Sequence, residues 1–270
     1  MLLALVRFLV GISLLAGLQV AFAQGAADVQ LEDLTWTELR DLIQAGKTTI
    51  IIPIGGTEQS GPYVALGKHN ARVRVLSQRI AQGLGNALVA PVIAYVPEGS
   101  YDPPTSHMRF PGTITVPDDV FEKTLESAAN SFKIHGFRNI IFLGDHGGYQ
   151  KDLTRVVNHL NKAWAKSPAR AFVPSEYYRA SSEGYAKILR ERGYRNEEIG
   201  THAGLADTSL LMAVAPQMVR EDKLRKASKP GVADGVYGGD PRRSSVELGR
   251  LGINAIVIQT IAAIRRDTAR

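Results

Sequence analysis

The chain has 270 residues, of which 32 are lysine or arginine and 26 are aspartate or glutamate, giving a formal net charge of +6. The basic residues are scattered and do not alternate with aromatic residues, so we expect no nucleic-acid partner. The absence of cysteine excludes disulfides and a cysteine nucleophile. The length is sufficient for one sizeable hydrophobic core.

The N-terminal segment has the pattern of a secretory signal peptide. One charged residue, Arg7, is followed by an apolar run that ends in Ala21-Phe22-Ala23. A transmembrane anchor is the alternative, because the run approaches the length that spans a bilayer. The small-x-small pattern before Gln24 favours cleavage. We expect a signal peptide over 1–23 and a periplasmic or secreted domain over 24–270 with no stable membrane span.

Predicted strands and helices alternate along the rest of the chain. Thr35 to Glu38 matches a capping box at the start of a helix, and residues 48–54 form a β-branched run typical of a strand buried on both faces. Further helices are expected over 72–84, 118–135, 151–166 and in the last segment after 245, and further strands over 87–96, 139–143 and 169–173. The alternation predicts a single α/β domain with a mainly parallel central sheet.

Polar residues follow the predicted strands. Glu58 comes after the first buried strand, and Asp145 and His146 come after another. Ligands of open α/β sheets bind beyond the carboxyl ends of the strands. Four of the six histidines fall in loops rich in glycine and proline: His69, His107, His146 and His202. Imidazole and carboxylate together suit a divalent cation of the first transition row, although histidines that only hold turns remain the alternative.

Other common catalytic motifs are absent from the sequence. It has no HExxH zinc motif and no G-x-S-x-G nucleophile elbow. Residues 61–68 are similar to a phosphate-binding loop but have one residue too many, and His69 stands where serine or threonine would bind magnesium. Serine-nucleophile and phosphate-loop chemistry are therefore disfavoured.

The loop motifs, taken in order, resemble those of the creatininase (creatinine amidohydrolase) family. The shared motifs are Gly55-Gly56-Thr57-Glu58-Gln59, Leu66-Gly67, Phe110-Pro111-Gly112-Thr113, His146-Gly147-Gly148, His202-Ala203-Gly204 with Asp207-Thr208-Ser209, and Gly238 to Pro241. The resemblance implies a three-layer α/β/α fold and assembly as a homo-oligomer. It also implies a metal-dependent hydrolase of cyclic or linear amides, typically with two divalent ions.

The resemblance assigns roles to individual residues. Glu58 and His146 match metal-binding residues, and His202 matches a histidine that positions or protonates the substrate. Asp207 falls where the family usually has glutamate and is a candidate metal ligand or a carboxylate beside a ligand. His107 precedes the Phe-Pro-Gly-Thr loop much as the family's histidine does.

Two departures from the family pattern affect the metal site. Ser60 replaces a metal-binding histidine, and the family's bridging aspartate falls on His69. Imidazole offers one lone pair and cannot bridge two cations as a carboxylate does. We therefore expect Glu58, His69 and His146 to hold one ion, zinc in preference to manganese or iron. A two-metal site rebuilt with Asp207 as the shared carboxylate is the alternative.

The combined prediction is a metal-dependent amidohydrolase that acts on a small, possibly cyclic, non-peptide amide. His202 and Asp207 are the predicted catalytic residues that move protons to the leaving nitrogen. Ser60 and His107 are expected beside the ligands or the substrate. Asp145 either orients the imidazole of a ligand or caps the following helix. An inactive protein of the same fold that binds a small ligand or a partner is the alternative, and the altered site makes creatinine itself a poor candidate substrate.

Overall fold

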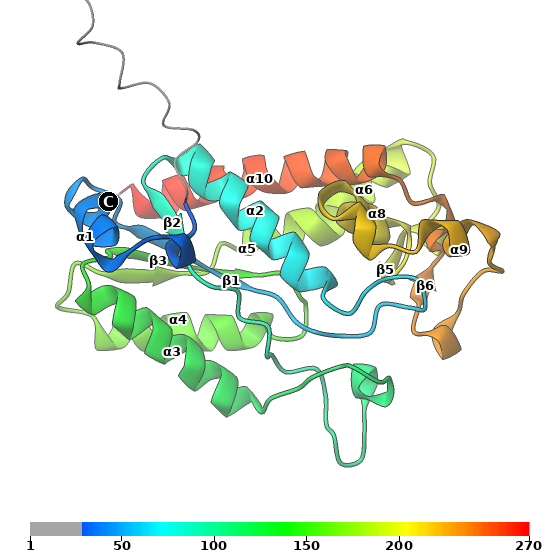
Figure 1. The fold of residues 1–270 in the computed structure, drawn as a ribbon, viewed down its shortest axis with the longest axis horizontal. Coiled ribbons are helices and arrows are strands. Elements are labelled where there is room, and N and C mark those ends of the chain that lie inside the picture. Colours follow the sequence, from blue (N-terminus) through cyan, green and yellow to red (C-terminus); the bar gives the residue numbers. More distant parts are fainter. Residues whose placement is uncertain (1–28, 270) are drawn as a thin grey trace, which may run out of the picture.

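The computed structural model describes residues 29–269, so the predicted signal peptide over 1–23 lies outside the described residues. Within this range a parallel four-stranded sheet lies between two layers of helices (Figure 1). The strand order is β2-β1-β3-β4, and each neighbouring pair is parallel. The predicted α/β fold with a parallel sheet is therefore confirmed.

The two central strands determine where the site lies. Strand β1 (Thr49–Ile54) pairs with β3 (Asn139–Gly144) along its whole length, with Ile54 opposite Gly144. The shorter strands β2 (Ala87–Val89) and β4 (Arg170–Phe172) pair with β1 and β3 on the outer sides. Since the central strands are parallel and in register at their ends, the residues that follow them start from the same edge of the sheet.

Both faces of the sheet are buried, which explains the continuous β-branched run in β1. Ile51 belongs to a core that includes side chains of α2 (Lys68–Leu84) and α10 (Val246–Thr268). Ile50 and Ile52 belong to a second core with α3 (Asp118–Ile134) and α4 (Gln150–Ala163). Alternate side chains of one strand thus point into different layers.

Helix α10 is long and apolar enough to cross a membrane by length and composition. In the structure it packs against α2 and α8 (Leu205–Val214), and Ile253, Ile256 and Ile264 are buried in the core. A Cβ added at Gly249 would overlap the carbonyl oxygen of Ser209, so the backbones of α10 and α8 approach closely. We therefore interpret α10 as a core helix.

Most of the remaining helices and strands lie beyond the carboxyl edge of the sheet, whereas α5 (Ser175–Arg179) packs against β3 and α10 (Figure 1). The others are a π-helical turn (Ala180–Gly184), α6 (Tyr185–Glu191), α7 (Asn196–Ile199), β5 (Gly200–His202), α9 (Glu221–Lys226) and β6 (Tyr237–Gly239). Strands β5 and β6 form a small antiparallel ladder in which His202 lies opposite Tyr237.

The predicted capping box is confirmed at α1 (Trp36–Gln44), where the Thr35 backbone N–H donates to Glu38 Oε2 (2.7 Å). Two predicted boundaries are wrong. Helix α2 begins at Lys68, so His69 lies on its first turn and not in a loop. Strand β2 ends at Val89, seven residues early, and Pro91 soon after has no backbone N–H with which to continue a ladder.

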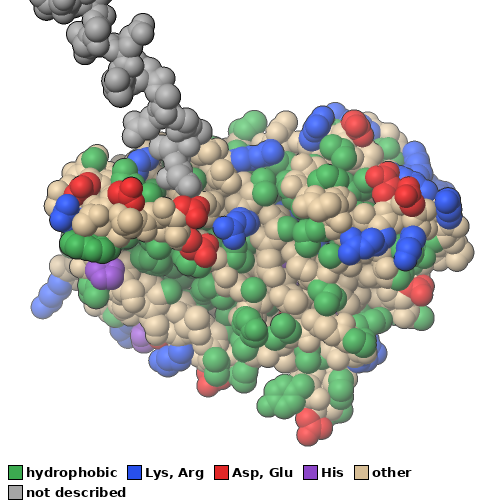
Figure 2. Space-filling model, viewed as in Figure 1, with side chains coloured by type: hydrophobic (Ala, Val, Ile, Leu, Met, Phe, Trp, Pro, Cys, Tyr) green, Lys and Arg blue, Asp and Glu red, His purple; other side chains and the backbone are tan. Residues whose placement is uncertain are grey.

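A long loop between β2 and α3 extends away from the body of the molecule (Figure 1). Hydrophobic side chains are visible near its tip (Figure 2), and Tyr101 of this loop is 69% exposed. The same loop then returns to the sheet edge through a short 3-10 helix (Ser106–Arg109), in which His107 is buried. The loop therefore delivers one histidine to the site from outside the main body.

Candidate metal centre

Four ligand-type side chains converge beyond the carboxyl ends of β1 and β3. One ligand atom from each of Glu58, Glu98, His107 and His146 lies within 4.8 Å of the corresponding atoms of the other three. Glu58 and His146 follow β1 and β3, whereas Glu98 and His107 come from the irregular segment after β2. We call these four residues the donor group.

Three distances within the donor group are close to those expected between neighbouring ligands of a tetrahedral metal ion. Glu58 Oε2 lies 3.3 Å from His107 Nε2 and 3.5 Å from His146 Nε2. His146 Nε2 lies 3.7 Å from Glu98 Oε2. Metal–ligand bonds of about 2.0–2.1 Å would place neighbouring corners of a tetrahedron about 3.4 Å apart. A divalent ion with nitrogen and oxygen ligands therefore fits between these atoms.

Carboxylate oxygens without a hydrogen-bond partner indicate that the donor group binds a cation. Glu58 Oε2 and both carboxylate oxygens of Glu98 are buried, and among the described residues none of them has a hydrogen-bond partner. A Cβ added at Gly56 would lie only 2.8 Å from Glu98 Oε1, so the missing side chain makes room for this carboxylate. Burial and the neighbouring Glu58 carboxylate raise the pKa of Glu98 to about 9. A bound cation would satisfy these oxygens and favour ionised Glu98.

The histidines around the centre are in the protonation state that metal binding requires. Burial lowers the pKa of His107, and it lowers the pKa of His146 to about 4. Both imidazoles are therefore neutral at pH 7. A neutral imidazole nitrogen has the lone pair that a metal ligand must offer.

His69 supports the donor group from outside it. Its Nε2 lies 2.8 Å from Glu58 Oε1, and its Nδ1 lies 2.6 Å from Asp145 Oδ2. Asp145 also accepts a hydrogen bond from the hydroxyl of Tyr177 (2.7 Å). Both ring nitrogens of His69 thus face carboxylates, because the first turn of α2 places the ring between Glu58 and Asp145. The geometry favours the four-residue donor group over the predicted set of Glu58, His69 and His146.

Asp145 was predicted to orient the imidazole of a metal ligand, and in the structure it holds His69, which lies beside the donor group. The other predicted role, capping of the next helix, is not observed: α4 follows Tyr149 at its N-cap, and no side chain caps it. The Asp145 carboxylate is fully enclosed and also accepts a hydrogen bond from Arg72 Nε (2.8 Å). The residue therefore holds His69, and through His69 it holds Glu58.

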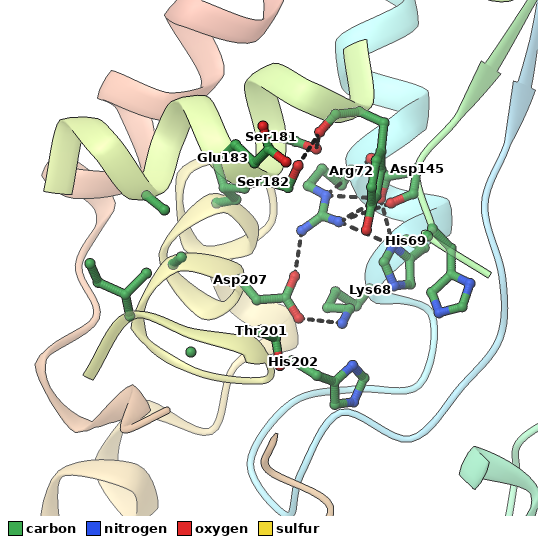
Figure 3. A pocket seen from close by; sticks show the side chains of 18 of the residues that line it. Lys68, His69, Arg72, Asp145, Ser181, Ser182, Glu183, Thr201, His202 and Asp207 are labelled. Atoms are coloured by element: carbon green, nitrogen blue, oxygen red, sulfur yellow. Dashed lines mark hydrogen bonds and ion pairs between the residues drawn. The ribbon is translucent and has the colours of Figure 1, made fainter. Parts of the chain in front are cut away.

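Asp207 lies between two buried cations (Figure 3). One carboxylate oxygen pairs with Lys68 Nζ, and the other accepts a hydrogen bond from Arg72 Nη1 (2.6 Å). Burial opposes ionisation of Asp207, but Lys68 and Arg72 outweigh it and hold its pKa well below the usual value. Asp207 therefore stays ionised as the counter-charge of Lys68 and Arg72. A carboxylate that is hard to protonate is a poor candidate for the proton shuttle that the sequence predicts.

His202 and Ser60 lie close to the donor group without belonging to it. His202 Nδ1 is 3.5 Å from Glu58 Oε1, and its Nε2 is 3.0 Å from the carbonyl oxygen of Gln59. Burial lowers the pKa of His202 to about 3, so its imidazole is neutral. Ser60 is buried two residues after Glu58, and its hydroxyl has no hydrogen-bond partner among residues 29–269.

The centre opens into a cavity of about 500 Å³. Figure 3 shows Lys68, Asp207 and His202 on one side of this cavity and Ser181, Ser182 and Glu183 of the π-helical turn across from them. Ala206 and Leu210 of α8 add apolar surface to the lining. The cavity therefore offers a small molecule both the metal-binding edge and a hydroxyl-rich wall.

Three residues of the centre are absent from the sequence-based prediction: Glu98, Lys68 and Arg72. Glu98 stands two residues after the predicted strand 87–96. Glu58 was chosen because ligands bind beyond the carboxyl ends of strands, and the same argument applies to Glu98. Lys68 and Arg72 are four residues apart and share one face of α2. This spacing is typical of an exposed charged helix face. The two side chains are buried because α2 packs with its first turn against the centre.

A family model described as creatininase, creatinine amidohydrolase, matches residues 32–264 of the chain. The chain belongs to the creatininase family. Family membership confirms the resemblance seen in the loop motifs.

Several relatives from this family are hydrolases. The chain is 23% identical over 198 residues to the creatinine amidohydrolase of Pseudomonas putida, covering 71% of this chain and 74% of that protein. It is 27% identical over 243 residues to the mycofactocin precursor peptide peptidase of Mycobacterium tuberculosis, covering 81% and 85%. It is 26% identical over 195 residues to the 3-dehydro-scyllo-inosose hydrolase of Thermotoga maritima. That match covers 72% of this chain but only 58% of the relative.

Solved creatininase structures share the fold. A crystal structure of creatinine amidohydrolase superimposes with a TM-score of 0.76 at 20% identity, covering 90% of this chain and 99% of that one. Two further creatininase structures, a manganese form and a mutant of the Zn-Zn type, each give a TM-score of 0.74 at 21% identity. The three-layer architecture predicted from the loop motifs is thus confirmed.

In metal-free protein, we expect Glu98 to make the free energy of unfolding decrease as the pH rises. The folded protein keeps a proton on Glu98 up to about pH 9, whereas the unfolded chain loses it near the model value of 4.5. Between these values the folded state binds more protons, so stability falls by up to about 1.4 kcal/mol per pH unit. Urea unfolding with a chelator from pH 5 to 9 should show a steeper decline for wild type than for Glu98→Gln. Parallel curves would contradict this assignment.

Proposed function

We propose that this protein is a metal-dependent hydrolase of a small amide C–N bond and that the donor group Glu58, Glu98, His107 and His146 holds its metal ion. The observation that carries the proposal is the convergence of four ligand atoms within 4.8 Å of one another, with three neighbouring pairs 3.3–3.7 Å apart, around carboxylate oxygens that have no hydrogen-bond partner among the described residues. We propose zinc as the ion because two imidazoles and two carboxylates at this spacing suit it. Manganese and iron accept the same donors.

A divalent ion at this position would supply a water of lowered pKa and polarise a carbonyl oxygen. The residues around it have separate tasks. His202 is the proposed proton carrier: its Nε2 faces the Gln59 carbonyl, which leaves Nδ1 to exchange a proton with the substrate. Asp207 holds Lys68 and Arg72 in place, and the Asp145–His69 pair holds Glu58.

The proposed substrate is an amide that fits the 500 Å³ cavity and has polar groups facing Ser181 and Ser182. A cyclic amide is supported by the relationship to a creatinine amidohydrolase. A peptide bond is the second candidate, supported by the longer match to a mycofactocin precursor peptide peptidase. Both substrate types contain the carbonyl carbon and leaving nitrogen on which the same residues would act.

We also propose that the protein acts in the periplasm or outside the cell. The support is the signal-peptide pattern of residues 1–23, with Arg7 before the apolar run and Ala21-Phe22-Ala23 at its end. Assembly as a homo-oligomer is proposed from the family resemblance. Both proposals concern where and in what form the enzyme works, and neither alters the chemistry of the centre.

The first test is zinc binding by wild type and two histidine variants, measured by competition with a chromophoric chelator. Wild type is expected to bind one equivalent. His107→Ala removes a donor and should weaken binding by more than about 100-fold, since loss of a partner that only orients a ligand already costs about 10–100-fold. His69→Ala should keep one equivalent with that smaller loss. His159→Ala, at an exposed position on α4, is the control. Equal losses in the His107 and His69 variants would contradict the assigned donor group.

The second part of the same test is hydrolysis. Zinc-loaded and chelator-treated protein are compared on creatinine, simple lactams, hydantoins and short peptides, with release of the amine measured. Turnover that requires zinc supports the proposal. Stoichiometric zinc without turnover on any of these compounds would favour the alternative of an inactive protein that binds a small ligand. Failure to bind zinc, manganese or iron would overturn the metal-dependent mechanism.

A further inference from the structure

The two carboxylate oxygens of Glu58 face two different positions for positive charge. Oε2 belongs to the donor group and lies 3.3 Å from His107 Nε2. Oε1 points to the other side, where Lys68 Nζ lies 3.3 Å away and His202 Nδ1 lies 3.5 Å away. One carboxylate thus links the metal position with a lysine ammonium.

The Lys68 ammonium is held in this place by its surroundings. The side chain is 1% exposed, and Nζ pairs with both Glu58 and Asp207. Two carboxylates in contact with one buried amine favour its charged ammonium form. Arg72, one turn later on α2, holds the opposite oxygen of Asp207. The ammonium is therefore a charge fixed in position by two carboxylates.

Lys68 is also in reach of a bound molecule. It lines the same cavity as His107, His146 and His202, and Figure 3 shows its ammonium beside Asp207 at the cavity wall. An ammonium has three N–H donors and no acceptor. Its two carboxylate partners account for two donors, which leaves one for an oxygen atom of a ligand.

We propose that Lys68 Nζ serves as a built-in second cation beside a single metal ion and donates a hydrogen bond to the substrate oxygen on which negative charge develops. This inference rests on the proposed function. Lys68 keeps its proton throughout, so no bond to it forms or breaks. Preorganised positive charge in a water-poor site stabilises such an oxygen more strongly than the same charge in water.

If the ammonium were removed, the side chains around it would be available to bind a metal ion. Glu58 Oε1, Asp207 Oδ2 and His202 Nδ1 would then face a space without a cation. Two carboxylates and one imidazole are a ligand set that zinc accepts. The inference therefore makes an unusual prediction: loss of a lysine should increase the number of bound metal ions.

The experiment is zinc stoichiometry by metal analysis after equilibrium dialysis. Wild type and Lys68→Arg, which keeps the charge, should bind one equivalent, whereas Lys68→Ala should bind two. Lys187→Ala, on the exposed side of α6, is the matched control and should bind one. Two equivalents in wild type, or one in folded Lys68→Ala, would overturn the inference. No zinc in wild type would overturn the proposed function as well, so the two failures are distinguishable.

A second measurement covers the case in which Lys68→Ala does not fold. Acetohydroxamate, an anionic oxygen ligand for zinc, is titrated into zinc-loaded wild type and Lys68→Met, a variant that preserves the length of the side chain. The methionine side chain fills the place of the ammonium, so this variant should keep one equivalent of zinc where Lys68→Ala binds two. We expect its acetohydroxamate affinity to fall by about 10- to 100-fold, which is the effect of losing one charge-assisted hydrogen bond. Unchanged affinity would overturn the role of Lys68 in binding the developing oxyanion.

Discussion

Glu58→Gln is expected to abolish stoichiometric zinc binding and hydrolysis together. Glu58 is fully buried, and its two oxygens face the donor group and Lys68. The amide keeps the shape of the side chain but loses its negative charge, so both cation positions lose their shared partner. We expect zinc affinity to fall by more than about 100-fold, beyond the effect of losing a merely orienting partner.

Competition with a chromophoric chelator measures the loss, and circular dichroism establishes that the variant is folded. Glu221→Gln is the matched control, because Glu221 is an exposed carboxylate on α9 and should leave zinc affinity unchanged. Wild-type affinity in folded Glu58→Gln would show that the metal is held elsewhere. Loss of zinc binding with undiminished turnover would show that hydrolysis does not need the ion.

Arg72→Met is expected to cost about 3–5 kcal/mol of the free energy of unfolding, the range for removing one partner of a buried ion pair. Arg72 is 3% exposed and donates to Asp145 (2.8 Å) and to Asp207 (2.6 Å). Methionine fills part of the volume but leaves both carboxylates short of a cation. Urea unfolding at pH 7 with a chelator present measures the loss without a contribution from bound metal.

Arg155→Met provides the comparison on the surface. Arg155 is half exposed and pairs with Glu122 (2.7 Å), so its loss should cost far less stability than the loss of Arg72. A similar small loss for Arg72→Met would mean that Asp145 and Asp207 find other partners or become protonated in the variant. That result would contradict the view that Arg72 is the main counter-charge of this buried cluster.

The irregular parts of the site were the hardest to predict from sequence. Glu98 and His107 lie in the segment between β2 and α3, where no hydrophobic periodicity relates sequence spacing to distance in space. His69 was expected in a loop because the first turn of α2 carries Lys68, His69 and Arg72, and these polar residues hide the helical pattern. They are polar because this turn faces the charged centre and not the apolar core.

The apolar runs and the loop residues after them were sufficient to predict a parallel α/β sheet and one edge of the site. The β-branched run at 48–54 and the apolar run at 139–143 form strands β1 and β3. Their parallel pairing brings Glu58 and His146 together because neighbouring carboxyl ends meet at one edge of the sheet. Which atoms face one another depends on how the helices and loops pack in three dimensions. His69 lies between two carboxylates, His107 arrives from a distant loop, and Lys68 reaches Glu58 because the orientation of α2 against the sheet points its first turn into the centre.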